Sequence, residues 1–344
     1  VSELMDLVRD DRPLGKIATT KIATYGPDNQ RDTVDAAVPD WLDLQEQAHG
    51  MLRDSNPETF MPRLERLQAQ LSRHSRLNPD GTLFALIHLS ASELQRYSAT
   101  HAMLVGVMCS LAVREVLKWP PELEAILLKA ALTMNIAMSD AQDRLALQHD
   151  APSPEQREQI DHHATRSVTV LEQLGVTDPL WLEAVRGHHA RVPGPLASRT
   201  EGSRMARLIQ RADMFAARLA PRASRASAAP GTAMQACYFD ENKQIDEAGA
   251  ALIKAVGIYS PGAFVRLATN EVAAVIKRGA NTTTPRVAVL VNRSGMPTGE
   301  LIVRDTAQRE YRIVASVSHR EVKVQINLER LLLLTKVAAS DRLW

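Results

Sequence analysis

The 344-residue chain is poor in aromatic residues, which make up only 4% of it, and it contains two cysteines, Cys109 and Cys237. Two cysteines so far apart exclude a disulfide framework and a cysteine-rich zinc site, and they agree with a reducing compartment. The formal net charge is only +1, so no global field attracts nucleic acid. We therefore expect no nucleic-acid polymer among its partners.

Long apolar runs are also scarce. No apolar run approaches the length that spans a bilayer, and acidic residues lie near the N-terminus where a signal peptide would carry basic and then apolar residues. We expect no membrane insertion and a cytoplasmic location. A chain of this length buries an ample core without metals, so stability by itself gives no reason to expect a metal.

Leucine and alanine are plentiful, and apolar residues recur mostly at helical spacing. Helices are predicted within 38–76 (two, around Pro57), 101–118, 122–138, 154–174, 178–189, 205–219 and 244–256. Residues 221–232 are predicted to form a mobile connection. After Gly257 the pattern becomes β-rich, with strands predicted at 264–267, 271–277, 287–291, 301–304, 311–315 and 322–326. The sequence thus predicts a mainly α fold, a helical bundle with a small β-containing C-terminal subdomain.

Histidines are the most informative feature of the predicted bundle. His101, His163, His188 and His189 fall at inward faces or ends of predicted helices, and helical bundles build metal sites from such side chains. Asp213 could add a carboxylate. Adjacent helical residues point about 100° apart, so the pair at 188–189 could share one ion only at a helix end. The alternative is that each histidine is an ordinary core or surface residue.

The order of several short motifs adds a family resemblance. The segments are Tyr97-Ser-Ala-Thr-His101, Ala130-Ala-Leu-Thr-Met134-Asn135-Ile-Ala-Met138, Ile160-Asp-His-His163, Val185-Arg-Gly-His188-His189, Arg211-Ala-Asp213 and Gly257-Ile-Tyr-Ser-Pro-Gly-Ala-Phe-Val-Arg-Leu. Together they resemble the HD-GYP family of bacterial cyclic di-GMP phosphodiesterases, which belongs to the HD superfamily. The resemblance covers about residues 85–280. It divides the chain into an N-terminal segment (1–84, mostly helical from about 38), an HD-GYP-like helical domain (85–280) and a small β-rich subdomain (281–344).

The resemblance implies that part of a metal site survives. The family's metal ligands match five residues: His101, His163, His188, His189 and Asp213. The family's His-Asp doublet, however, falls on Met134 and Asn135, and its following lysine falls on Met138. Loss of the bridging aspartate removes the charge that holds two metals together. We expect no catalytic residues here, and at most one divalent ion (Fe, Mn or Zn) at the histidines.

Two further departures and one match concern phosphate. After His189 the chain reads Ala190-Arg-Val-Pro-Gly-Pro195 without the family's Gly-Tyr-Pro signature, and Tyr97 lies where some members supply a carboxylate, so a third metal is not expected. Arg222 and Arg225 match a basic pair near the family's substrate phosphate, and guanidinium groups bind phosphate bidentately. The alternative for this pair is a solvated basic linker.

The resemblance and its departures favour a non-catalytic HD-GYP-like regulator that acts through another signalling protein or by binding cyclic di-GMP. The alternative is a metal-dependent cyclic di-GMP phosphodiesterase with a substituted site, in which Asp140 or Asp143 is recruited. A phosphohydrolase of another nucleotide is a third hypothesis, and it shares the weakness at 134–135.

We predict no appreciable hydrolysis of cyclic di-GMP by the purified chain with manganese or iron, because the bridging carboxylate and the lysine are both replaced. The measurement is chromatography of the nucleotide products. Turnover at about 1 per second, an ordinary enzyme value, would contradict the non-catalytic hypothesis.

Overall fold

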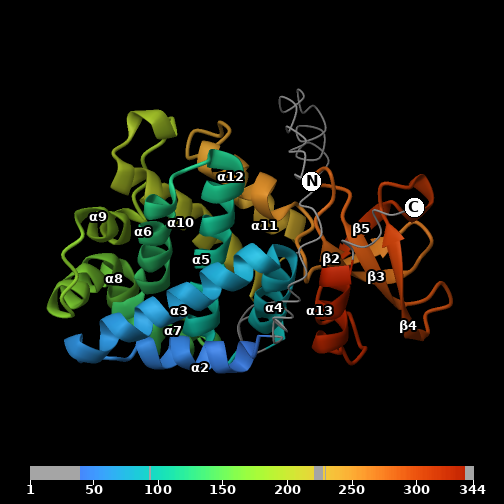
Figure 1. Cartoon of the computed structure of the whole chain (residues 1–344), viewed down its shortest axis with the longest axis horizontal. Coiled ribbons are helices and arrows are strands. Elements are labelled where there is room, and N and C mark those ends of the chain that lie inside the picture. The colour runs from blue at the N-terminus through green and yellow to red at the C-terminus, as the bar shows by residue number, and fades with distance from the viewer. Residues whose placement is uncertain (1–38, 93, 221–227, 229, 338–344) are drawn as a thin grey trace, which may run out of the picture.

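The computed structural model describes residues 39–92, 94–220, 228 and 230–337, and it is mainly helical with one small sheet (Figure 1). The helices are α2 (Trp41–Met51), α3 (Pro57–Leu77), α4 (Pro79–Ser92), α5 (Tyr97–Leu111), α6 (Pro121–Thr133), α7 (Ser139–Leu147), α8 (Pro154–Gln173), α9 (Pro179–Gly187), α10 (Glu201–Leu219), α11 (Pro230–Tyr238), α12 (Glu247–Val256) and α13 (Leu328–Val337). The predicted fold class is confirmed.

The strands form one antiparallel sheet in the order β4-β3-β2-β1-β5. They are β1 (Phe264–Leu267), β2 (Val272–Lys277), β3 (Arg286–Val291), β4 (Pro297–Asp305) and β5 (Ile313–Val317). The inner strands β2 and β3 are almost wholly buried, whereas the edge strand β4 is largely exposed. Figure 1 shows the sheet beside the helices, with α4 and α13 between them, and both of these helices contact β2.

Helix α5 lies at the centre of the bundle. All fifteen of its residues are buried, and it contacts α2, α3, α4, α6, α7, α10 and α12. It continues through a π-helical turn (Ala112–Leu117), so that Tyr97–Leu117 is, among the described residues, a helix long and apolar enough to cross a membrane. This corrects the expectation that no apolar run has that length. Because 78% of its most apolar window is buried inside the protein, its composition is explained by its central position in the core, and the cytoplasmic location stays a prediction.

One hydrophobic core extends from Trp41 in α2 to Leu332 in α13 and includes both helices and sheet. The domain boundary that we place after residue 84 falls inside α4, and the one after residue 280 falls between the paired strands β2 and β3. The described parts of the three predicted segments therefore share a core. Cys109 and Cys237 are free and buried within it, as small apolar residues would be.

Three local predictions were wrong, and helices α4, α7 and α13 were not predicted. The predicted helix 122–138 ends at Thr133, because Asn135 leaves the helical region (φ −110°, ψ 17°), and a 3₁₀ turn (Ile136–Met138) follows. Helix α11 begins at Pro230, within the predicted connection, and α13 was not foreseen. The segment 322–326 is not a strand. Its Val322 and Ile326 pack against the core, so their alternation reflects burial of one face without strand pairing.

Arg278, directly after β2, fastens the sheet to the helices. Its guanidinium donates to Asp80 of α4 (2.6 Å), to Glu115 in the π-helical turn (2.6 Å) and to the carbonyl of Ala255 in α12. The side chain of Asp80 is only 10% exposed. Removing the guanidinium would leave this carboxylate buried without its cation, which is costly.

We predict that Arg278→Met lowers the free energy of unfolding by about 2–4 kcal/mol, because it breaks a largely buried ion-pair network. Urea unfolding followed by circular dichroism measures the change. Arg293→Met is the matched control, since Arg293 pairs with Glu310 where both side chains are more than half exposed, and such pairs contribute about 0–1 kcal/mol. Equal losses in the two variants would refute a fastening role for Arg278.

Candidate metal site

Two helices with strong N-terminal caps carry the histidines of the site. Helix α8 begins with a capping box at Ser153, and α9 begins with Asp178 as N-cap followed by Pro179. The indole of Trp181 in α9 donates to the Thr133 hydroxyl at the end of α6 (2.9 Å). This bond ties α9 to α6 and sets the position at which α9 ends.

His163, His188 and His189 meet at one point. The Nε2 atom of His163 lies 3.1 Å from Nε2 of His188 and 3.1 Å from Nε2 of His189. His163 comes from the middle of α8, and His188 is the C-cap of α9, which confirms that the adjacent pair converges at a helix end. A tetrahedral ion at about 2.0–2.1 Å from each nitrogen would hold the nitrogens about 3.3 Å apart, close to the two separations from His163, and all three ligand atoms lie within 4.8 Å of one another.

Hydrogen bonds to the backbone fix which nitrogen of two rings carries the proton. Nδ1 of His163 lies 2.6 Å from the carbonyl oxygen of Ile160, and Nδ1 of His188 lies 2.6 Å from that of Val185. A carbonyl only accepts, so each Nδ1–H donates and each neutral ring presents a lone pair at Nε2. Nε2–H of His189 can donate to Nε2 of His163. The contact between Nε2 of His163 and Nε2 of His188 then contains no proton that either ring could donate. Two facing lone pairs with anchored Nδ1–H groups form the ligand arrangement of a metal site.

Burial keeps the two inner rings neutral. His188 is fully buried, and this burial, together with the positive charge that His189 and His163 would carry, lowers the pKa of His188 to about 3. Burial also lowers the pKa of His163. Neutral imidazole is the form that binds metal, so at neutral pH protons compete only weakly with a metal ion for these two rings. His189 is exposed, and the site opens to solvent on its side.

The other two matched residues form a separate pair. Nε2 of His101 lies 2.6 Å from a carboxylate oxygen of Asp213, and the His101 ring stacks on Tyr97, a partner that spacing alone did not reveal (centroids 5.3 Å apart). The carboxylate only accepts, so His101 Nε2–H donates to it. The pair is therefore satisfied by itself, with the ligand nitrogen of His101 occupied by a proton.

Asp213 links this pair to the three histidines electrostatically. Burial raises the pKa of Asp213, but the hydrogen bond from His101 and the charge that His101, His188 and His189 carry when protonated outweigh it and lower the pKa to about 2. The five residues thus lie in one neighbourhood as two groups: three histidines with facing lone pairs, and a self-satisfied histidine-aspartate pair.

The substituted positions lie beside this neighbourhood. Met134 and Met138 are buried, as expected for core residues. The Ala137 amide donates to Ser167 (3.2 Å), which lies one helical turn after His163 on α8. Within the described structure, the side-chain oxygen of Asn135 is buried without a hydrogen-bond partner. Such an oxygen needs a donor or a cation, and this supports the fit of a cation or a water molecule here.

The acidic residues proposed as substitute ligands are engaged elsewhere. Arg53 at the end of α2 pairs with Asp140 (2.8 Å) and with Asp143 (2.6 Å), and Asp143 also accepts from the Ser98 amide (2.6 Å). Their recruitment to the histidines stays a prediction, and these pairs do not favour it, because Arg53 already offsets their charge. Arg222 and Arg225 lie outside the described residues.

A buried arginine pair on α10 was missed by the sequence analysis. Arg207 pairs with Asp246 (2.6 Å) and Glu241 (2.9 Å), and Arg211 pairs with Glu241 (3.2 Å). Asp246 is also the N-cap of α12. The network holds α10 against α12 and thereby positions Asp213 two residues after Arg211. Two arginines spaced one turn apart on an amphipathic helix were its only signal in the sequence.

Comparison with known proteins finds no matching family model, no matching curated protein and no matching solved structure.

We predict that the chain binds one equivalent of zinc with the three histidines. His163→Gln should weaken binding about 100-fold or more, because even residues behind the ligands contribute about 10–100-fold. His162→Gln is the control, since the neighbouring His162 is exposed. Competition with a zinc chelator measures the affinity, and elemental analysis measures the stoichiometry.

Two tightly bound equivalents in the wild-type chain would contradict the single-ion site, as would equal affinities of the two variants. The triple variant Met134→His, Asn135→Asp, Met138→Lys is the positive control. It restores the residues that the HD-GYP resemblance implies and should raise the metal content.

Proposed function

We propose that this chain is a non-catalytic HD-GYP-like regulatory protein that holds one divalent ion at His163, His188 and His189 and uses this site to bind a cyclic dinucleotide. The observation that carries the proposal is the convergence of three Nε2 atoms, two of them on rings whose Nδ1–H groups are anchored to backbone carbonyls. This geometry prepares ligands for an ion before it arrives.

The residues around the histidines favour binding over hydrolysis. A second ion would need His101 Nε2, which already donates to Asp213, and a bridging carboxylate, which Asn135 replaces with a neutral amide. Met138 supplies no cation for the scissile phosphate. In this proposal the chain lacks the groups that would activate a water molecule against a phosphate.

Access and charge indicate how a phosphate would be bound. The exposed ring of His189 forms the open side of the site. Asp213, whose pKa is lowered to about 2, is negative at neutral pH and repels an anion. A divalent ion on the three histidines would supply the positive charge that attracts a phosphate oxygen. Binding of a dinucleotide should consequently depend on the ion.

The phosphodiesterase alternative finds less support in the described residues. It requires a carboxylate near the three histidines in place of the lost aspartate. Asp140 and Asp143 are both paired with Arg53, and Asp213 is bonded to His101. Action on another signalling protein is also part of the proposal. Such a partner can bind the chain differently when the metal site is occupied, and this needs no chemical step.

Isothermal titration of the full chain with cyclic di-GMP tests the proposal. We expect binding by the zinc-loaded chain, a loss of about tenfold or more in affinity after chelation or in His163→Gln, and wild-type affinity in His162→Gln, because the ion must offset the charge of Asp213. An affinity for cyclic di-GMP that stays the same after chelation would contradict the role of the ion. If the zinc-loaded chain does not bind, the dinucleotide is excluded and a protein partner is left as the route of action.

A further inference from the structure

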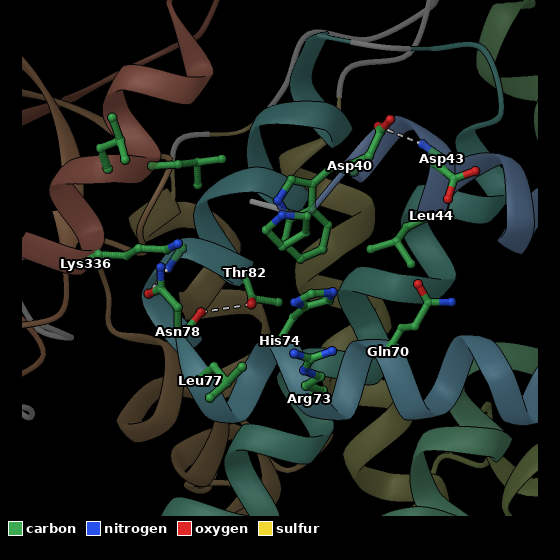
Figure 2. Close-up of a pocket in the computed structure, with 15 residues that line it drawn as sticks. Asp40, Asp43, Leu44, Gln70, Arg73, His74, Leu77, Asn78, Thr82 and Lys336 are labelled. Atoms are coloured by element: carbon green, nitrogen blue, oxygen red, sulfur yellow. Dashed lines mark hydrogen bonds between the residues drawn. The ribbon is translucent and has the colours of Figure 1, made fainter. Parts of the chain in front are cut away.

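A pocket of about 550 Å³ lies far from the histidines in the chain, where α2, α3, α4 and α13 meet (Figure 2). This volume falls in the range of about 300–1,000 Å³ that is typical of small-molecule sites. The helices come from both ends of the described chain, so only the tertiary fold creates the pocket. Neither the HD-GYP resemblance nor the proposed metal site involves it.

The pocket has an apolar lining. Trp41 and Leu44 of α2 line it together with Leu332 of α13, and all three side chains are buried. At its rim, Leu77 is 64% exposed and Leu333 is 52% exposed. Exposed leucines on both sides of an apolar hollow indicate that an apolar group would gain by entering it.

A buried donor in the lining has no acceptor. Trp41 is 5% exposed, and its indole Nε1–H lacks a hydrogen-bond partner within the described structure. A buried N–H without a partner costs free energy, and such groups in folded proteins are usually satisfied. The Trp41 ring packs against the ring of His74, another lining residue, with the ring centroids 5.7 Å apart. The indole could donate to an oxygen of a bound molecule.

Two cations line the pocket without partners. Arg73 and Lys336 are exposed, and no ion pair or hydrogen bond joins either to another described residue. His74 also lies in the lining, and its pKa is lowered first by burial and then by the charges of Arg73 and Lys336. The charges of both cations are therefore felt at His74, and among the described residues no acidic side chain pairs with either of them.

The acidic residues of the pocket are used by their own helix. Asp40 caps α2 by accepting from the amides of Leu42 and Asp43, and Asp43 accepts from Gln47 (2.8 Å). Figure 2 shows Asp40 and Asp43 on the opposite side of the pocket from Lys336. The pocket thus combines apolar lining residues, a donor without a partner in the described structure and two cations.

We propose that this pocket binds a small organic anion: an apolar body in the hollow and a carboxylate, sulfonate or phosphate group at Arg73 and Lys336. The apolar surface of the body would cover Leu44 and Leu332, and an oxygen of the molecule would accept from Trp41 Nε1. The proposal is independent of the metal site, so each can fail without the other.

Two fluorescent probes of similar shape test the proposal on the full chain. Anilinonaphthalene sulfonate carries an anionic group, whereas N-phenylnaphthylamine has nearly the same apolar body without a charge. We expect the sulfonate to bind, and the variant Arg73→Gln/Lys336→Gln to weaken its binding about tenfold while leaving the neutral probe unchanged. Trp41→Phe, which keeps a ring but removes Nε1–H, should also weaken binding of the sulfonate.

Arg66→Gln is the matched control, since Arg66 is an exposed arginine two turns earlier on α3 and does not line the pocket. It should bind both probes as the wild type does. The proposal is overturned if the full chain binds neither probe, if the double variant keeps the affinity of Arg66→Gln for the sulfonate, or if it loses both probes equally.

Discussion

The complete burial of α5 is the constraint on which the rest of the structure depends. A helix that is apolar on every side must be surrounded, and seven other helices contact it. At Gly106 an added Cβ would lie 2.6 Å from a terminal methyl of Leu128 in α6, so a larger residue there would force that side chain to shift. Thr100 and His101 are polar residues in this buried helix, and they are met by Gln45 (2.7 Å) and Asp213 (2.6 Å). The polar pairing also fixes the His101 ring against Asp213.

The metal site follows from the same requirement that buried polar groups have partners. A buried ring must satisfy both nitrogens, and in His163 and His188 a backbone carbonyl satisfies only Nδ1. The remaining lone pairs face each other, and an ion is the partner that would satisfy them together. In contrast, His101 and Asp213 satisfy each other. This asymmetry is the physical reason to propose one ion, and with it binding in place of hydrolysis.

Much of the fold and part of the site could be predicted from local patterns. Apolar spacing marked most helices, and the cap Asp178 with Pro179 marked the start of α9. The pair His188-His189 required a helix end to share an ion, and the chain does end α9 there. The end of α6 could not be predicted, because no glycine or proline marks it and Thr133 and Asn135 lie in an apolar run. The strand predicted at 322–326 failed because alternation records burial of one face, whereas pairing depends on a free sheet edge.

The sequence by itself determined the residue types at the site: histidines that can bind an ion, an aspartate, and Met134, Asn135 and Met138 in place of reactive groups. Only the tertiary structure decided which of these groups meet. His163 and His188 are brought within 3.1 Å by the packing of α8 on α9, and Asp140 and Asp143 pair with Arg53 in the turn after α2. The pocket at Trp41 likewise needs α13, nearly three hundred residues along the chain from α2. Contacts between side chains distant in sequence depend on how helices pack, and the local spacing of residues does not determine that packing.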